Sequence, residues 1–344
     1  MRWNRPKSWL NNKHIVTEKN NHKTVLVTGI GGNVGYGILM NIRQNHPAVR
    51  IIGTNTDRVS AGNHLCDEVI EVPFALNNEY LPVIRKIYRE QQVDLVIPST
   101  DYEAYVLAPE KGEMNIAVSS PEAASTFLDK YLTYQKLQAS GLAFAESILP
   151  SDYKNQFSEY IVKPRDGRGS RGLLFNPPDV SGLADTNIVQ PLLKGVEITT
   201  AAYITRQNTC HGLITMKRQL DHGATYKCQV VTEYDDMMAE YIQKLIGVIS
   251  ISGSFNIQSI VTDGVIVPFE INCRISGTNS IRTHFGFKDV EYTLSEYLFN
   301  ESPAPVTITT GSAVRILYDI IYPGIPLNRI NNNRDDFFGH ERKH

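Results

Sequence analysis

The sequence predicts two architectures in one chain: a parallel, doubly wound α/β lobe, followed by a mainly antiparallel α+β region. Between residues 24 and 119, short β-branched segments alternate with segments whose apolar residues recur at helical spacing. This alternation is typical of a parallel sheet covered by helices. From Tyr160 onward, longer strand-like segments are joined by glycine turns, which favours antiparallel pairing.

In the first lobe, β-branched and apolar residues mark the strands. We expect these strands at 24–30, 50–55, 67–73, 93–100 and 114–120. Apolar residues at helical spacing predict helices at 35–43 and 81–92.

The second region begins with a predicted helix at 129–140. Its expected strands are 159–164, 171–175, 187–191, 197–205, 211–220, 253–261, 264–274 and 312–322. Further helices are predicted at 236–248 and 290–299, and the polar tail from 326 to 344 is expected to be frayed.

The composition narrows the class of function. The chain has 344 residues, which is long enough for two or three packed lobes. Its net charge of -2 argues against a dedicated nucleic-acid binder. Its apolar runs are shorter than the roughly 18 to 20 residues that span a bilayer. We therefore expect small-molecule partners, and neither a nucleic-acid nor a membrane partner.

The N-terminal segment and the cysteines indicate a cytoplasmic setting. Residues 1–23 are polar and lack the apolar core of a signal peptide, so we expect a mobile extension. The four cysteines show neither a C-x-x-C pair nor zinc-ligand spacing. We expect them to be reduced, buried thiols.

Glycines at 29, 32 and 35 lie between a predicted strand and a predicted helix. This spacing matches the dinucleotide-binding turn of NAD-dependent epimerases and short-chain dehydrogenases. Those enzymes need a tyrosine followed four residues later by a lysine, and none of the seventeen tyrosines has a lysine at that position. We interpret the glycines as a tight connection that can contact a substrate, with NAD chemistry kept as an alternative.

The final residues, 340–344, spell the zinc-protease pattern H-E-x-x-H. That chemistry needs a helix in a cleft and a third ligand. A chain terminus following a polar run offers neither, so we do not expect a zinc protease.

A glycine-rich basic segment follows Lys163, which ends an apolar strand. Such a loop can fold its backbone N–H groups over phosphates while the lysine neutralises their charge. The alternative is a basic surface hairpin. The clustering of charge favours an anionic ligand; the glycine, serine and basic residues concerned are Gly167, Gly169, Ser170 and Gly172, with Arg165, Arg168 and Arg171.

The segment Gln190, Pro191, Leu192 and Leu193 ends the next strand. A strand edge with free backbone groups can recognise an adenine. Glu197, just beyond, can accept hydrogen bonds from ribose hydroxyls, although a solvated strand residue would look the same.

The most informative segment is a predicted hairpin over 255–272. Glu270 and Asn272 are two residues apart and so face the same side of the sheet, and Gln258 can face them from the paired strand. Such oxygen-bearing side chains suit Mg²⁺ shared with nucleotide phosphates. Arg274 continues this face and would bring positive charge to a transferring phosphoryl group. The alternative is a solvated polar face.

These features, in this order and spacing, resemble the ATP-grasp ligases, and most nearly the carbamoyl-phosphate-synthase-like ATP-grasp proteins, which include amino-acid ligases. The resemblance covers about residues 24 to 320, and E-x-N-x-R at 270–274 is its most specific part. Cys273 stands where many relatives have proline. The resemblance implies a Rossmann-like pre-ATP-grasp domain at 24–119 and an ATP-grasp domain at 120–325, with a lid subdomain at about 141–192.

The resemblance also implies roles for individual residues. Lys130 and Lys163 would contact the ATP phosphates, the loop Gly167–Gly172 would be the lid, Gln190–Leu193 would hold the adenine and Glu197 the ribose. Gln258, Glu270 and Asn272 would hold Mg²⁺ or Mn²⁺. The implied catalytic residues are Arg274, at the transferred phosphate, with Lys217 and Arg218.

By resemblance, the implied reaction activates a carboxylate as an acyl phosphate and joins it to an amine, with release of ADP and phosphate. The substrates would be a small carboxylic acid or amino acid and an amine, and a homodimer is compatible with the resemblance. Arg282 and His284 are candidate substrate contacts on position alone. Besides the NAD-dependent enzyme, a non-catalytic nucleotide-binding module remains an alternative.

Overall fold

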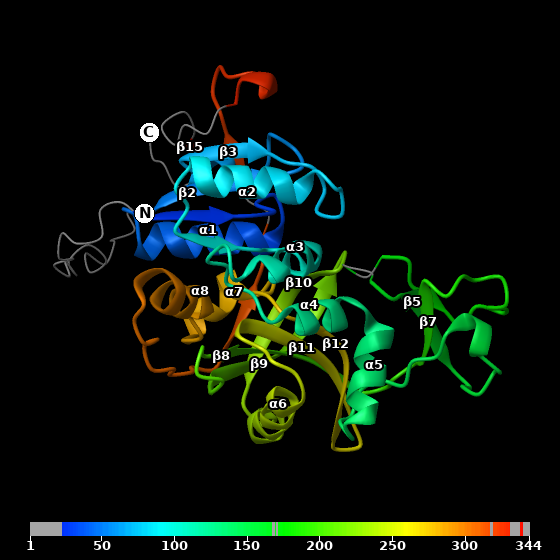
Figure 1. Ribbon diagram of the computed structural model, residues 1–344. Helices are drawn as coiled ribbons and strands as arrows, with labels where there is room; N and C mark the ends of the chain where they lie inside the picture. The colour runs from blue at the N-terminus through cyan, green and yellow to red at the C-terminus, as the bar shows by residue number, and fades with distance from the viewer. Residues whose placement is uncertain (1–22, 167–168, 170, 317–318, 331–337, 340–344) are drawn as a thin grey trace, which may run out of the picture.

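The computed structural model describes residues 23–166, 169, 171–316, 319–330 and 338–339. Residues 1–22, most of the C-terminal tail and the H-E-x-x-H pattern lie outside the described residues. The described chain forms an α/β lobe, a large antiparallel sheet with helices, and a small sheet that projects to one side (Figure 1). The predicted fold class is confirmed.

The first lobe contains a four-stranded parallel sheet in the order β3-β2-β1-β4. Its strands are β1 (Thr24–Val27), β2 (Arg50–Asn55), β3 (Glu68–Glu71) and β4 (Leu95–Ile97), and its main helices are α1 (Asn33–Asn45) and α2 (Tyr80–Glu90). The strand expected at 114–120 is reduced to one bridge between Val96 and Ile116. The short helix η2 (Asn63–Leu65) lies between β2 and β3.

A run of helices leads from the first lobe to the second region: α3 (Asp101–Leu107), η3 (Ala108–Glu110), α4 (Pro121–Leu128) and α5 (Lys130–Ala139). Thr100 caps α3 in a capping box with Glu103, and the Asp129 side chain caps α5. These caps fix the first residues of two helices, Asp101 and Lys130. Both residues border the site described below.

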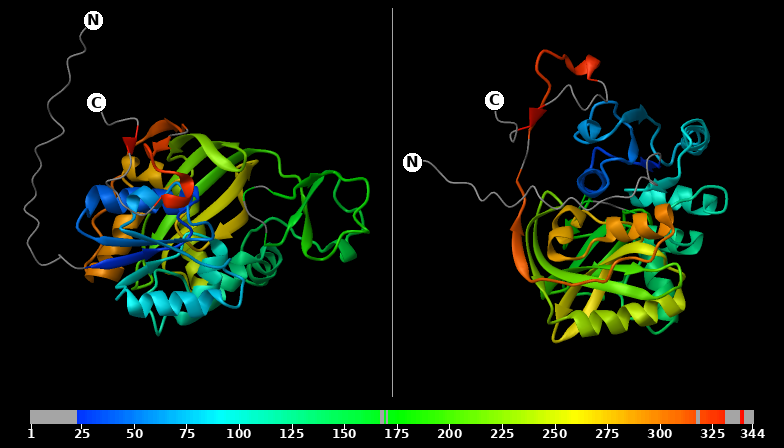
Figure 2. Two further views of the ribbon diagram at one scale, coloured as in Figure 1. Left: turned by 90° about the horizontal axis from the view of Figure 1, so that it is seen from above. Right: turned by 90° about the vertical axis from the view of Figure 1, so that its left-hand side faces the viewer.

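The small sheet has the order β6-β5-β7, formed by β5 (Tyr160–Pro164), β6 (Leu174–Phe175) and β7 (Asn187–Pro191), with η4 (Pro150–Asp152) preceding them. Val162, Val180 and Val189 form its own small core. Figure 2 shows this unit projecting away from the rest of the molecule. Because Val162 is directed into this core, the neighbouring residue Lys163 is directed to the opposite face.

The large sheet has six strands in the order β12-β11-β8-β9-β10-β13, all antiparallel. Their bounds are β8 (Val196–Ile204), β9 (Cys210–Asp221), β10 (Ala224–Val231), β11 (Gly253–Thr262), β12 (Val265–Asn272) and β13 (Gly311–Val314). Sequence analysis missed β10. A two-residue His222–Gly223 turn joins it to β9, with both residues at positive φ, which is a typical hairpin turn.

Helices cover both faces of the large sheet. On one face, α6 (Asp235–Val248) packs Met238, Ile242 and Leu245 against Ile257 and Ile271. Between the other face and α1 lie α7 (Asn279–Arg282), η5 (Thr283–Phe285), α8 (Asp289–Thr293) and the π-helical turn η6 (Leu294–Phe299). The last elements in the described part of the chain are β14 (Ile320–Ile321), η7 (Leu327–Arg329) and β15 (Phe338–Gly339).

Other sequence expectations concern solubility and cysteines. Within the described part of the chain, helices fall short of the length and apolarity needed to cross a membrane. Cys66, Cys228 and Cys273 are buried thiols, and Cys210 is partly buried.

Candidate functional site

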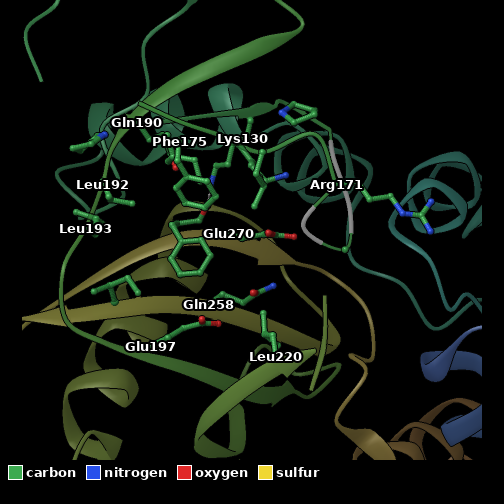
Figure 3. Close-up of a pocket in the computed structure, with 18 residues that line it drawn as sticks. Lys130, Arg171, Phe175, Gln190, Leu192, Leu193, Glu197, Leu220, Gln258 and Glu270 are labelled. Carbon is green, nitrogen blue, oxygen red and sulfur yellow. Dashed lines mark hydrogen bonds between the residues drawn. The ribbon is translucent and has the colours of Figure 1, made fainter. Parts of the chain in front are cut away.

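A cavity of about 290 Å³ lies between the small sheet and the β11–β12 hairpin. Figure 3 shows Glu270, Gln258 and Glu197 on strands of the large sheet, with Leu192 and Leu193 to one side of them. Residues from β5, β7, β8, β11, β12 and α5 line the cavity, so segments far apart in the sequence meet here. Among the lining residues are Lys130, Lys163, Gly169, Arg171, Phe175, Gln190, Pro191, Leu192, Leu193, Glu197, Leu220, Gln258, Phe269 and Glu270.

Two lysines lie at the inner end of this cavity, and both are almost fully buried. Lys163 Nζ donates to the Phe269 carbonyl at 3.3 Å, and Lys130 Nζ donates to the Arg165 carbonyl at 3.4 Å. Burial, together with the charge of Lys130 and despite that of Glu270, lowers the pKa of Lys163 to about 7. Two buried ammonium groups beside an open cavity are suited to phosphate oxygens.

Glu270 is a partly buried carboxylate whose charge acts on these lysines. Burial acts to raise its pKa, but the charges of Lys130 and Lys163, with smaller contributions from Asn272 and Arg274, hold the pKa of Glu270 below its ordinary value. The carboxylate is therefore ionised at neutral pH, as a metal ligand must be.

The three residues expected to hold a metal converge on one face of the hairpin. Gln258 and Glu270 are directly paired across β11 and β12. Gln258 donates to Asn272 Oδ1 at 3.4 Å, and Asn272 donates to Glu270 Oε1 at 3.1 Å. This donor set, with one carboxylate and two carboxamides, fits a magnesium ion that takes its remaining ligands from phosphates and water.

Arg218 joins this cluster to the cavity wall. Its guanidinium donates to Glu197 at 3.0 Å and 2.8 Å and also to Gln258. Glu197 is thus held in place from β9, with one carboxylate oxygen carrying both of these bonds. An oriented carboxylate at the mouth of the cavity can accept hydroxyl donors.

Arg274 borders two smaller cavities, of about 160 Å³ and 220 Å³, on the other side of Glu270. It forms an ion pair with Asp101 of the first lobe at 2.7 Å. Its Nε atom is buried and has no hydrogen-bond partner among the described residues. Asp101 lines both cavities as well, so the first lobe completes this part of the site. We call the 220 Å³ cavity the reaction cavity.

The structure does not bring Lys217 to this site. Lys217 and Arg218 are consecutive strand residues, so their side chains point to opposite faces of the sheet. Lys217 pairs with Glu233 at the start of α6, on the face away from the cavity. A strand supplies only one of two adjacent basic residues to a given face.

The structure also places the remaining predicted residues. Gly169 lines the first cavity, and Gly172 adopts φ +71° beside Pro164. Gly167 and Ser170 lie outside the described residues. The Gln190 side chain is buried and donates to Ser147 at 2.8 Å.

Arg282, considered as a substrate contact, is fully buried instead. It is 0% exposed and pairs with Asp289, and its NH1 donates to Ser276 and Thr278. Arg282 therefore supports the wall of the reaction cavity from behind. His284 lines a separate outer cavity.

Two further residues that line these cavities, Asp101 and Arg315, were not predicted from the sequence. The capping box at Thr100 and Glu103 marks the helix start next to Asp101, but nothing in the sequence indicates that this helix faces Arg274. Arg315 lies in an expected strand, and only the order of strands in the sheet brings it beside Gly277.

The glycine turn at 29–35 serves close packing. A Cβ atom at Gly35 would lie 2.5 Å from the carbonyl oxygen of Gly29, and Gly29 itself has φ +59°. Within the same turn, Asn33 and Val34 line the reaction cavity. This agrees with a tight connection next to a ligand cavity.

Comparison with known families places both parts of the chain. Residues 127–278 match a family model described as an ATP-grasp domain, and residues 25–119 match one described as a PylC-like, N-terminal domain. A search of curated proteins finds no match.

Solved structures share this fold at low sequence identity. N5-carboxyaminoimidazole synthetase from Staphylococcus aureus, complexed with ADP, superimposes with a TM-score of 0.70 at 14% identity, covering 86% of this chain and 82% of that one. Phosphoribosylglycinamide synthetase from Anaerococcus prevotii gives 0.65 at 14%, covering 92% and 93%. The biotin carboxylase domain of 2-oxoglutarate carboxylase from Hydrogenobacter thermophilus, with MgADP and bicarbonate, gives 0.66 at 12%, covering 87% and 75%.

Proposed function

This chain belongs to the ATP-grasp superfamily, and on that premise we propose that it is a ligase that activates a carboxylate as an acyl phosphate and couples it to an amine. The observation that carries the proposal is the meeting of Lys130, Lys163 and Glu270 at the inner end of one cavity. Two buried ammonium groups near one partly buried carboxylate suit a nucleoside triphosphate with its metal ion.

In this proposal, ATP occupies the 290 Å³ cavity. Pro191, Leu192 and Leu193 lie against the adenine, and Glu197, held by Arg218, accepts from the ribose hydroxyls. Lys130 and Lys163 bind phosphate oxygens, with Gly169 in the covering loop. Phe175 and Leu220 close the apolar walls around the base.

Glu270, Asn272 and Gln258 would hold Mg²⁺. When bound, the ion neutralises charge on the terminal phosphates and polarises the transferred group. Since Glu270 is the one carboxylate in this set of three ligands, we expect the metal to bind appreciably only together with the nucleotide.

The reaction balances without a covalent enzyme intermediate. A carboxylate oxygen of the acid attacks the γ-phosphorus of ATP, the bond to the β–γ bridging oxygen breaks, and ADP leaves. The amine nitrogen then attacks the carbonyl carbon of the acyl phosphate, expels inorganic phosphate and loses a proton. Arg274, which borders the cavity beyond Glu270, stabilises charge on the transferred group.

The two alternatives have less support. In an NAD-dependent enzyme the glycine turn would contact a pyrophosphate, whereas here Gly35 is explained by its contact with Gly29. For a non-catalytic module, the convergence of Gln258, Glu270 and Asn272 on one face, beside an oriented Arg274, is not required. A ligase uses all of these groups.

Two measurements test the proposal. Thermal shift should show stabilisation by Mg·ATP and none by NADH. A library of carboxylic acids with hydroxylamine as the amine should then yield a hydroxamate, ADP and phosphate from the correct acid. Stabilisation by NADH alone, or formation of AMP and pyrophosphate from the active acid, would contradict it.

A further inference from the structure

An outer cavity of about 370 Å³ adjoins the reaction cavity. The first turns of α1, the segment around η5 and the chain after β13 enclose it. Asn33 and Arg315 line both cavities, so they form the boundary between them. A molecule that reacts beside Glu270 can therefore extend past Arg315 into the outer cavity.

Arg315 differs from the other arginines around the reaction cavity. Arg218 pairs with Glu197, Arg274 with Asp101 and Arg282 with Asp289. Arg315 has no acidic partner within ion-pair distance in the described part of the chain; its NH2 donates to the Gly277 carbonyl at 2.7 Å.

The carboxylates of Asp101 and Glu270 line the reaction cavity together with Arg315, but neither forms an ion pair with it. Arg315 is half-buried, and this burial lowers its pKa. The described residues that line the outer cavity include no aspartate and no glutamate. An anionic ligand would offset the cost of burying the guanidinium.

The start of α1 adds a second attraction for an anion at the same boundary. Gly32 is the N-cap residue and gives no side-chain cap, and the helix is 13 residues long. The first N–H groups of such a helix lack intrahelical partners and carry partial positive charge. Asn33, the first helical residue, lines both cavities, as Arg315 does.

Beyond this boundary the outer cavity has mixed apolar and polar walls. Tyr36, Met40 and Ile316 contribute apolar surface, and Ser280 and His284 contribute polar groups. These walls fit an uncharged arm of moderate size.

We propose that the amine substrate carries an anionic group, a carboxylate or a phosphate, which Arg315 and the start of α1 bind, while its uncharged arm occupies the outer cavity. This rests on the proposed ligase function. An amino acid meets the requirement, because its amine and carboxylate leave one carbon in different directions and its side chain leaves in a third. The amine then faces the acyl phosphate in the reaction cavity.

The test uses the full chain saturated with Mg²⁺ and a non-hydrolysable ATP analogue. Thermal shift is measured with amino acids, with their amides, and with aminoalkyl phosphates. We expect stabilisation by amino acids with uncharged side chains or by the phosphates, which identifies the anionic group, and none by the amides.

Substitutions locate the binding. R315Q should weaken binding of the active amine by about tenfold or more, because a charge-assisted hydrogen bond is lost, and R315K should weaken it less. M40W should fill the outer cavity, so amino acids with large side chains should no longer bind, whereas the binding of glycine should be unchanged. R89Q, at an exposed position on α2, is the matched control.

The outcomes separate this proposal from the ligase function. Absence of any shift with the nucleotide analogue would overturn the proposed function itself. A nucleotide shift together with equal response to amides and acids, no response to any anionic amine, or unchanged binding in R315Q would overturn the role of Arg315 alone.

Discussion

The 290 Å³ cavity proposed for the nucleotide (the nucleotide cavity) and the reaction cavity share Glu270, but their cationic side chains are held in different ways. In the 290 Å³ cavity, buried Lys163 is balanced by a carbonyl hydrogen bond, the face of the Phe269 ring at 5.1 Å and the charge of Glu270, and its pKa still falls to about 7. In the reaction cavity, Arg218 and Arg274 are each fixed by a carboxylate.

This difference separates a cation whose charge depends on a bound ligand from cations whose charge and orientation are fixed by the protein itself. A buried lysine with a lowered pKa gains its full charge only when phosphates arrive. A paired arginine keeps its charge and its orientation throughout, as an electrostatic catalyst requires. In the proposed function, the 290 Å³ cavity would therefore serve binding, and the reaction cavity would serve transition-state stabilisation.

Glu270→Gln should have the largest effect, because it removes the one carboxylate that both cavities share. We expect turnover to fall by about a thousandfold or more, since phosphoryl transfer depends on the bound metal ion. Steady-state ADP release measures this. Near-normal turnover, with Glu240→Gln on the exposed face of α6 as the matched control, would show that the metal assignment is wrong.

Lys163→Met should mainly affect nucleotide binding. The loss of one charge-assisted contact to phosphate is expected to weaken Mg·ATP binding by about 10- to 100-fold. Calorimetric titration gives the dissociation constant. Lys86→Met on α2 serves as the control, and an unchanged constant in Lys163→Met would place the phosphates elsewhere.

Asp101→Asn should affect catalysis without affecting nucleotide binding. Without its carboxylate partner, Arg274 loses its fixed orientation, so we expect kcat to fall by about tenfold while Mg·ATP affinity stays nearly unchanged. Steady-state kinetics and titration together test this, with Asp236→Asn as the control. A loss of nucleotide affinity equal to the loss of kcat would contradict the division.

The smallest expected effect is a pH dependence of nucleotide binding. Lys163 has a pKa of about 7 without ligand, and phosphates raise it, so binding takes up a proton above pH 7. Affinity should therefore be level below pH 7 and fall by about fivefold between pH 7 and 8. Titrations in buffers of different ionisation enthalpy measure the proton uptake.

The arginine in Lys163→Arg stays charged over this pH range, so the pH dependence of nucleotide binding should disappear in this variant. If the wild-type chain and this variant show the same dependence on pH, another group is responsible.

The sequence by itself determined the two architectures and predicted a set of site residues, several of which the structure brings together around one cavity. Strand periodicity placed Glu270 and Asn272 on one face, and Gln258 faces them in the structure as expected, because a hairpin is a local arrangement. Lys163 was also identified, since it follows an apolar strand and precedes a glycine loop. Such features depend on residues close together along the chain.

Only the tertiary structure decided which residues that are far apart in the sequence come into contact. Asp101 meets Arg274 across 173 positions, and Arg315 lies at the boundary of two cavities only because β13 pairs with β10 at the sheet edge. In the structure, Lys217 lies on the sheet face toward α6, away from the cavities, because side chains alternate along a strand. Arg282 is buried behind the wall of the reaction cavity, where it pairs with Asp289. Local periodicity fixes the face of a strand, but only packing decides what that face meets.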